Sequence, residues 1–164
     1  MIPGMIALKI QNVQNFMNLL LMTDTFDHFT LEDAVIKTFA TFNIDGLYDS
    51  SFFDSEQDSE DRQSFDSYTP WGLVRHNCTE IIKGKHTPVF MKYVLHGSKK
   101  DFSDLPEYAD IKALLMIIKY DPNGLTVTTG TSMNTFSLDH GIDDLWDKAV
   151  KELLKNKDVA FEEL

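Results

Sequence analysis

The chain has 164 residues, 43% of them hydrophobic, and its formal net charge at pH 7 is −11. This size and composition predict one folded domain spanning residues 1–164, and they exclude wholesale disorder. The negative charge argues against nonspecific binding to nucleic acid or to an anionic membrane, and no apolar run reaches the roughly 18 residues of a membrane-spanning helix.

The N-terminal part of the chain predicts a short strand, Met5 to Ile10, followed by an amphipathic helix that Asn12 caps. Apolar side chains recur in this helix at the spacing of one buried face, and they are Val13, Phe16, Met17, Leu20 and Leu21. The opposite face carries three uncharged amides, Gln14, Asn15 and Asn18. These amides fit an ordinary solvated surface, and they also fit a face that hydrogen-bonds a protein partner.

Two strands are predicted next, Phe29 to Leu31 and Ala34 to Ile44, with the polar pair Glu32 and Asp33 as a tight connection. The chain then enters an acidic, serine-rich stretch at residues 49–68, whose composition predicts a long loop. Its candidate anchors are the aromatic residues Phe52, Phe53 and Phe65.

A second helix is predicted over residues 70–83, with Thr69 as its N-cap and Gly84 as its C-terminal stop. Its apolar stripe consists of Trp71, Val74, Cys78, Ile81 and Ile82. A strand over residues 88–96 follows, and Lys92 makes its polar face basic.

A β-hairpin is the clearest local pattern in the chain. Asp121-Pro122-Asn123-Gly124 separates two strand-like runs, and Asn-Gly tolerates the positive φ that tight hairpin turns require. The first run, Ala113 to Ile118, is apolar at every position, which predicts a central strand covered on both faces. In the second run, Gly130 predicts a bulge or a close approach, and Met133 to Leu138 is a candidate continuation of the strand.

The last predicted element is a helix with Asp139 as its cap and lysines near its end. Val159 to Leu164 is expected to trail away from it. The fold class is therefore α+β: a mainly antiparallel sheet, with two or three amphipathic helices packed on it and a helix at the C-terminus.

Charge is distributed unevenly along the chain. From Asp45 to Pro70 eight acidic residues stand against one arginine, a net charge of −7, and from Trp71 to Lys100 six basic residues stand against one glutamate, a net charge of +5. Opposed potentials of this kind guide association, so the acidic stretch of one copy is expected to attract the basic segment of another.

Motifs for metal or cofactor chemistry do not emerge from the sequence. The five histidines never stand at the i, i+4 spacing of a helical metal pair, and neither phosphate-binding glycine pattern occurs. We predict no metal and no cofactor. The lone Cys78 is interpreted as a core residue, and with an N-terminus unlike a signal peptide it predicts a cytoplasmic protein.

The segments TPWGLVRHNCTEIIKGKHTP, LTVTTGTSMNTFSLD and ALKIQNVQNFMNLLL resemble a family of small uncharacterised bacterial proteins, which implies no activity and no catalytic residue. The predicted element order also resembles one domain of a DNA sliding clamp. This second resemblance implies that two helices, Asn12 to Met22 and Pro70 to Lys83, face a DNA duplex. The first helix departs from that pattern, because it carries amides and no basic residue.

Two functions remain open from the sequence. The first is a non-catalytic binding or assembly domain that binds a protein partner or a second copy of itself. A variant of this hypothesis is weak binding of nucleic acid through Arg75, Lys83, Lys85 and Lys92. The alternative is an enzyme that acts on a small molecule through distant residues, with candidates His76, His96, Glu80 and Asp110.

Overall fold

The computed structural model of the chain describes residues 5–52, 67–98, 111–134 and 141–164, and every structural statement below concerns this part of the chain. It contains eight strands and three α-helices, and this arrangement confirms the predicted α+β fold class. The strands are β1 (Ala7–Ile10), β2 (Thr30–Lys37), β3 (Thr41–Asp45), β4 (Thr69–Pro70), β5 (Phe90–His96), β6 (Ile111–Asp121), β7 (Gly124–Met133) and β8 (Phe161–Glu163). The helices are α1 (Val13–Met22), α3 (Trp71–Ile82) and α4 (Gly141–Asn156), and a short 3-10 turn, η1, covers Ser50–Phe52.

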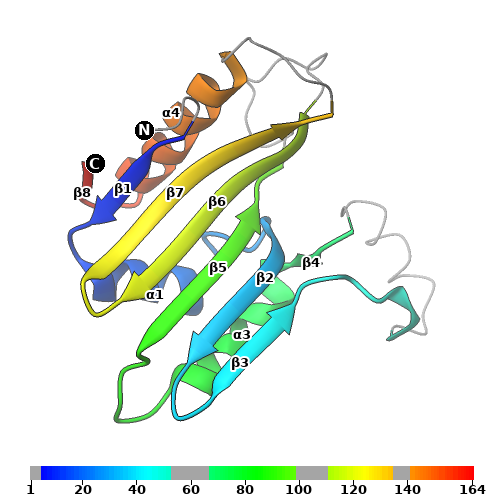
Figure 1. The fold of residues 1–164 in the computed structure, drawn as a ribbon, viewed down its shortest axis with the longest axis vertical. Helices are drawn as coiled ribbons and strands as arrows, with labels where there is room; N and C mark the ends of the chain where they lie inside the picture. Colours follow the sequence, from blue (N-terminus) through cyan, green and yellow to red (C-terminus); the bar gives the residue numbers. More distant parts are fainter. Residues whose placement is uncertain (1–4, 53–66, 99–110, 135–140) are drawn as a thin grey trace.

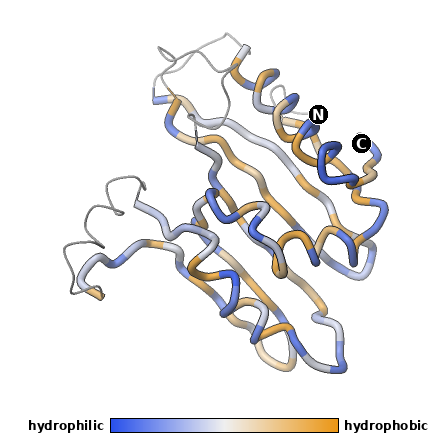
Figure 2. Tube along the Cα trace, turned by 180° about the vertical axis from the view of Figure 1, so that it is seen from behind, coloured by the Kyte–Doolittle hydropathy of each residue, from blue (hydrophilic) through white to orange (hydrophobic). Residues whose placement is uncertain are grey.

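The strands form one antiparallel sheet in the order β3-β2-β5-β6-β7-β1-β8, and β4 pairs with one end of β2. All three helices lie on the same face of this sheet, which we call the helix side, and we call the opposite face the outer face (Figure 1). Seen from behind, the helices stand in front of the strands (Figure 2). None of the helices in the described part of the chain has the length and apolar composition of a membrane-spanning helix.

The hydrophobic core lies between the sheet and the helices. Phe16 of α1, Trp71 of α3 and Trp146 of α4 are each 0% exposed, and they belong to one apolar cluster with Leu8 and Tyr93 of the sheet. Burying side chains of this size contributes about 2 to 3 kcal/mol each. This shared core holds the three helices on one face.

The prediction that the apolar run in β6 is covered on both faces is wrong for the outer face. Leu114, Met116 and Ile118 are at most 1% exposed and point to the helix side. Leu115 and Ile117 alternate with them and stay partly exposed on the outer face. The physical reason is that no described helix packs on that face.

The predicted turn at Glu32 and Asp33 is also wrong, because β2 runs through both residues. The chain reverses later, where the Thr38 N–H donates to the carbonyl of Ala40 at 2.9 Å. A register shift against β5 between Leu31 and Asp33 marks a β-bulge at Glu32. A bulge tolerates a polar residue inside a strand because the extra residue leaves the regular ladder.

The predicted β6–β7 hairpin is confirmed, with Asp121 paired to Gly124 across a two-residue turn at 122–123. Gly124 takes the positive φ, +134°, whereas Asn123 does not need one. The ladder is unbroken where Gly130 pairs with Leu115, and a Cβ atom at Gly130 would lie at an ordinary 3.7 Å from Leu115, so the prediction of a bulge or a close approach at this glycine is wrong.

The helix termini agree in part with the sequence. Asn12 caps α1 as predicted, accepting a hydrogen bond from the Asn15 N–H at 3.0 Å. Thr69 does not cap α3, because it lies in β4 and its hydroxyl donates to the carbonyl of Gly46 at 2.9 Å. The predicted cap of α4, Asp139, and the predicted strand continuation at 135–138 lie outside the described residues.

The C-terminal segment does not trail away as predicted. Residues Phe161–Glu163 form β8, which pairs with β1 in antiparallel register. The N–H of Leu164 donates to the carbonyl of Ala7, and the N–H of Gln11 donates to the carbonyl of Ala160, both at 2.9 Å. The two ends of the described fold therefore lie side by side, as Figure 1 shows.

Candidate functional site

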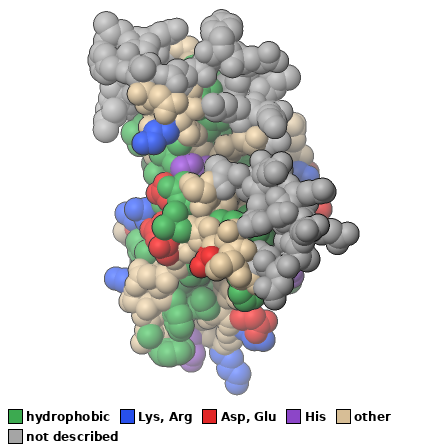
Figure 3. Space-filling view, turned by 90° about the vertical axis from the view of Figure 1, so that its right-hand side faces the viewer, with side chains coloured by type: hydrophobic (Ala, Val, Ile, Leu, Met, Phe, Trp, Pro, Cys, Tyr) green, Lys and Arg blue, Asp and Glu red, His purple; other side chains and the backbone are tan. Residues whose placement is uncertain are grey.

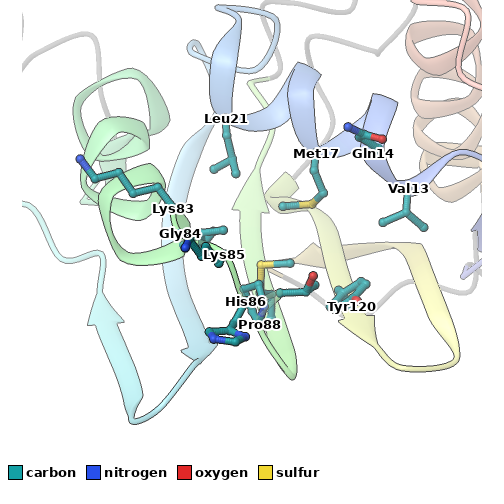
Figure 4. A pocket seen from close by; sticks show the side chains of 13 residues that line it. Val13, Gln14, Met17, Leu21, Lys83, Gly84, Lys85, His86, Pro88 and Tyr120 are labelled. Atoms are coloured by element: carbon teal, nitrogen blue, oxygen red, sulfur yellow. The ribbon is translucent and has the colours of Figure 1, made fainter.

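A cavity of about 540 Å³ opens between α1 and the connection that follows α3, and we call it the α1–α3 groove. The sheet closes its base on the helix side (Figure 4). The residues that line it are Val13, Gln14, Met17, Leu21, Ile82, Lys83, Gly84, Lys85, His86, Thr87, Pro88, Met91 and Tyr120. Its size falls within the range of small-ligand and side-chain pockets, roughly 300 to 1,000 Å³.

One wall of the groove comes from α1. Val13, Met17 and Leu21 stand four residues apart, so a helix places them on one face, where they line the groove (Figure 4). Met91 of β5 and Tyr120 of β6 are paired neighbours in the sheet and form the base. The groove is therefore mainly apolar along its wall and base.

The other wall comes from the end of α3. Ile82 is the last helical residue, and Lys83 leaves the helix with extended backbone angles. Gly84 then takes a φ of +143°, a conformation that side chains disfavour, and this turns Lys85 and His86 toward the groove rim. The sequence-predicted stop at Gly84 is confirmed.

The rim of the groove is cationic. Lys83, Lys85 and His86 line it, and none of the described residues lining the groove is acidic. Lys83 does meet Glu80 at 2.6 Å, but both side chains are about two-thirds exposed. Such surface pairs contribute little, roughly 0 to 1 kcal/mol, so Lys83 stays available to an incoming anion.

Arg75, the remaining predicted basic residue on α3, is held in a structural role. Its guanidinium donates two hydrogen bonds, both of 2.8 Å, to the carboxylate of Asp27, and a third of 3.4 Å to the carbonyl of Leu21. The hydrogen bond to Asp27 is the main reason why the pKa of Arg75 is raised. These contacts join α3 to the C-terminal end of α1.

Of the three amides of α1, Gln14 alone lines the groove. Asn15 is partly buried at the helix start, and Asn18 is exposed elsewhere on α1. Lys92 lies on the outer face, where it pairs in register with Lys119 of β6. The structure therefore brings Gln14, Lys83 and Lys85 together and separates the other predicted partner-binding residues from them.

The catalytic candidates do not share a site. His96 is 8% exposed and lies 2.9 Å from the Oε1 atom of Glu32, with the ring of Tyr68 4.8 Å from its own ring. His76 and Glu80 are exposed on α3, and Asp110 lies outside the described residues. The sequence does not identify Glu32 as a partner of His96, because the polar pair Glu32 and Asp33 predicts a turn rather than part of a strand.

Cys78 is a core residue, as predicted. It is 0% exposed, and burial raises the pKa of its thiol to about 12. A thiol with so high a pKa is a poor nucleophile at neutral pH. Among the described residues no group of three or more His, Cys, Asp or Glu side chains is arranged to hold a metal ion.

The sequence does not indicate the apolar half of the groove. The spacing of Met17 and Leu21 predicts the buried stripe of a helix, and Tyr120 lies beyond the apolar run Ala113 to Ile118 that predicts the strand. The signal that could have identified them is the contrast between a fully apolar helix face and a neighbouring connection rich in basic residues at 83–86.

Comparisons with known proteins give one match. The model of a family of unknown function (DUF5721) matches residues 19–162 of the chain. No curated protein and no solved structure matches the chain. The expected similarity to a DNA sliding-clamp domain therefore stays a prediction.

Proposed function

We propose that this chain, which belongs to that family of unknown function, is a non-catalytic binding domain whose α1–α3 groove holds an acidic segment of a partner protein. The observation that carries the proposal is the combination of an apolar wall and base with a rim of Lys83, Lys85 and His86. An apolar anchor side chain would fill the groove, and flanking carboxylates would meet the cations.

The chemistry of the groove favours binding over catalysis. Its lining residues offer apolar surface and positive charge, and the candidate catalytic residues His76, His96 and Glu80 do not line it. The alternative function, an enzyme acting on a small molecule, needs two of its candidates in one pocket. The described residues do not bring two of them into hydrogen-bond contact.

The chain itself contains a segment with the composition that the groove requires. Residues 49–68 carry seven acidic residues against Arg62, together with Phe52, Phe53 and Phe65. Phe52 is 81% exposed. A peptide of this sequence is therefore a suitable probe, and capture of the same segment from a second copy is the homo-oligomeric form of the proposal.

The test is a titration of the full chain with a synthetic peptide of residues 49–68, followed by NMR at low salt. We expect shifts at the methyl groups of Met17, Leu21 and Met91. A control peptide with its three phenylalanines replaced by serine keeps the charge and should bind much more weakly. Equal binding of both peptides, or shifts away from the groove, would contradict the proposal.

A matched pair of variants distinguishes the effect of charge at the groove rim from the effect of the net charge of the protein. Lys85→Glu reverses a rim charge, and Lys157→Glu reverses an exposed charge just beyond α4. We expect Lys85→Glu to weaken peptide binding about five-fold, and Lys157→Glu to leave it nearly unchanged. Binding should also weaken as salt rises, because screening reduces attraction between exposed charges.

Nucleic-acid binding is a weaker candidate. Of the four basic residues predicted for it, Arg75 is bonded to Asp27 and Lys92 lies on the outer face. Lys83 and Lys85 alone provide few phosphate contacts, and affinity grows with their number. A mobility-shift experiment at low salt tests this variant, and we expect no retarded band.

A further inference from the structure

In the described part of the chain, one edge of the sheet is formed by β3. β3 pairs with β2 on one side and is the end strand of the described sheet. Its five residues, Thr41–Asp45, include no proline and no lysine, and the register with β2 is unbroken. Proteins usually protect an exposed sheet edge with prolines, lysines or β-bulges. The opposite edge, β8, is short and carries Glu162 and Glu163.

The hydrogen bonds of the neighbouring turns show which backbone groups face this edge. The Gly46 N–H donates to the carbonyl of Glu32, and the Thr38 N–H donates to the carbonyl of Ala40, both at 2.9 Å. Because bonded and non-bonded pairs alternate in an antiparallel ladder, residues 42 and 44 bond toward β2. The N–H and C=O groups of Thr41, Asn43 and Asp45 therefore point outward.

The side chains of β3 are complementary to themselves in the antiparallel direction. When Asn43 of one copy stands opposite Asn43 of a second copy, Thr41 stands opposite Asp45 and Phe42 opposite Ile44. A hydroxyl then meets a carboxylate and two apolar side chains meet on the helix side, with no pair of like charges. All three outward-facing residues find an outward-facing partner in this register.

Two exposed apolar side chains flank β3 symmetrically. Phe39 is 95% exposed and Leu47 is 61% exposed, and each is four residues from Asn43. In the same register Phe39 of one copy approaches Leu47 of the other. Figure 3 faces this edge and shows hydrophobic side chains reaching the surface among polar ones. Large apolar side chains exposed in this way are typical of interaction surfaces.

We propose that two copies of the chain form a two-fold symmetric dimer, in which their β3 strands pair antiparallel about Asn43 and join the two sheets. A two-fold axis through Asn43 makes the contact closed, because the same surface serves both copies. None of the residues of β3 lines the α1–α3 groove, so the contact does not depend on the proposed binding function. A small interface of this kind predicts a concentration-dependent dimer.

The test is sedimentation velocity of the full chain over a range of concentrations, with Asn43→Pro and Asn43→Ala compared. Proline removes the outward N–H, which β2 does not use, whereas alanine keeps it. We expect Asn43→Pro to raise the dimer dissociation constant about ten-fold or more, and Asn43→Ala to change it little. A wild-type chain that stays monomeric, or equal effects of the two variants, would overturn the proposal.

Two further measurements keep the proposal testable if the proline variant fails to fold. Asn43→Lys keeps the backbone and places two positive charges on the symmetry axis, so it should also abolish the dimer. A nitroxide on Asn43→Cys should show strong dipolar broadening between copies, while one on Lys157→Cys should not. A dimer that survives Asn43→Lys, or that shows no broadening at position 43, has another interface.

Discussion

The guanidinium of Arg75 on α3 and the carboxylate of Asp27 form a bidentate salt bridge, with both N–O distances at 2.8 Å. The side chains are 13% and 28% exposed, so water screens the pair only partly. The Nε1 atom of Trp71 donates to the carbonyl of Leu20 at 2.9 Å, beside the contact of Arg75 with Leu21. Side chains of α3 thus satisfy carbonyl groups at the end of α1, which its own helix leaves unpaired.

We expect Arg75→Lys to lower the free energy of unfolding by about 1 to 2 kcal/mol, because an ammonium group cannot reproduce two parallel hydrogen bonds. Urea denaturation of the variant and the wild type measures the difference. Lys83→Arg, an exposed exchange of the same kind on the groove rim, is the control and should be nearly neutral. An equal, small effect of both exchanges would show that the Asp27 pair contributes little.

The elements that the sequence predicts well are those specified by neighbouring residues. The β6–β7 hairpin depends on the turn at 121–124, and α1 depends on its cap Asn12 and the spacing of its apolar residues. The elements that it misses depend on distant residues. β8 is a strand because β1 offers it an edge, and Glu32 stays within β2 because β5 allows a bulge beside His96.

The candidate site shows the same division. The basic rim is visible in the sequence, since Lys83 is the last residue of the predicted helix and Lys85 follows its stop at Gly84. The apolar base is not, because the pairing of Met91 with Tyr120 joins strands nearly thirty residues apart. The prediction from charge also included Arg75 and Lys92 in the same binding surface. In the structure Arg75 is bonded to Asp27, and Lys92 lies on the outer face.

Gly46, at the end of β3, has no room for a side chain. A Cβ atom there would overlap the carbonyl oxygen of Leu31 and lie 2.9 Å from that of Glu32, and both atoms belong to the backbone of β2. We therefore expect Gly46→Ala to destabilise the chain by about 3 kcal/mol. Gly130→Ala is the matched control, because its Cβ would lie at an ordinary 3.7 Å from Leu115.

Gly130→Ala should leave the free energy of unfolding unchanged or raise it by about 0.5 kcal/mol, since alanine restricts the unfolded chain more than glycine does. Thermal unfolding of the two variants, followed by circular dichroism, makes the comparison. Similar losses at both glycines would contradict the close approach at Gly46 and point instead to a general intolerance of the sheet.

Asp147 of α4 predicts a pH dependence of stability. Its carboxylate accepts a hydrogen bond from the Thr129 hydroxyl, whose oxygen in turn accepts from the Ile6 N–H at 3.2 Å. Burial raises the pKa of Asp147; the Thr129 hydrogen bond opposes this, and nearby Asp143 adds to it. The native state therefore binds this proton more tightly than the unfolded chain does.

The sign of the effect follows from proton linkage. Between the ordinary carboxyl pKa and the raised one, the native state binds more protons, so the contribution of Asp147 to stability falls as pH rises through this window. Asp147→Asn keeps an oxygen that accepts from Thr129 and cannot ionise. We expect its free energy of unfolding, relative to wild type, to increase with pH through the window and then to stay constant at neutral pH.

Urea denaturation of wild type and Asp147→Asn at several pH values from 3 to 7 measures this difference. Asp144→Asn provides the control, because it removes an exposed charge from the same helix, and that charge is only one of the smaller causes of the raised pKa of Asp147. The control should show a smaller dependence on pH. If the free energies of unfolding of Asp147→Asn and wild type differ by the same amount at every pH, then burial does not raise the pKa of Asp147. In that case α4 packs more loosely on β7 than the hydrogen bond from Thr129 implies.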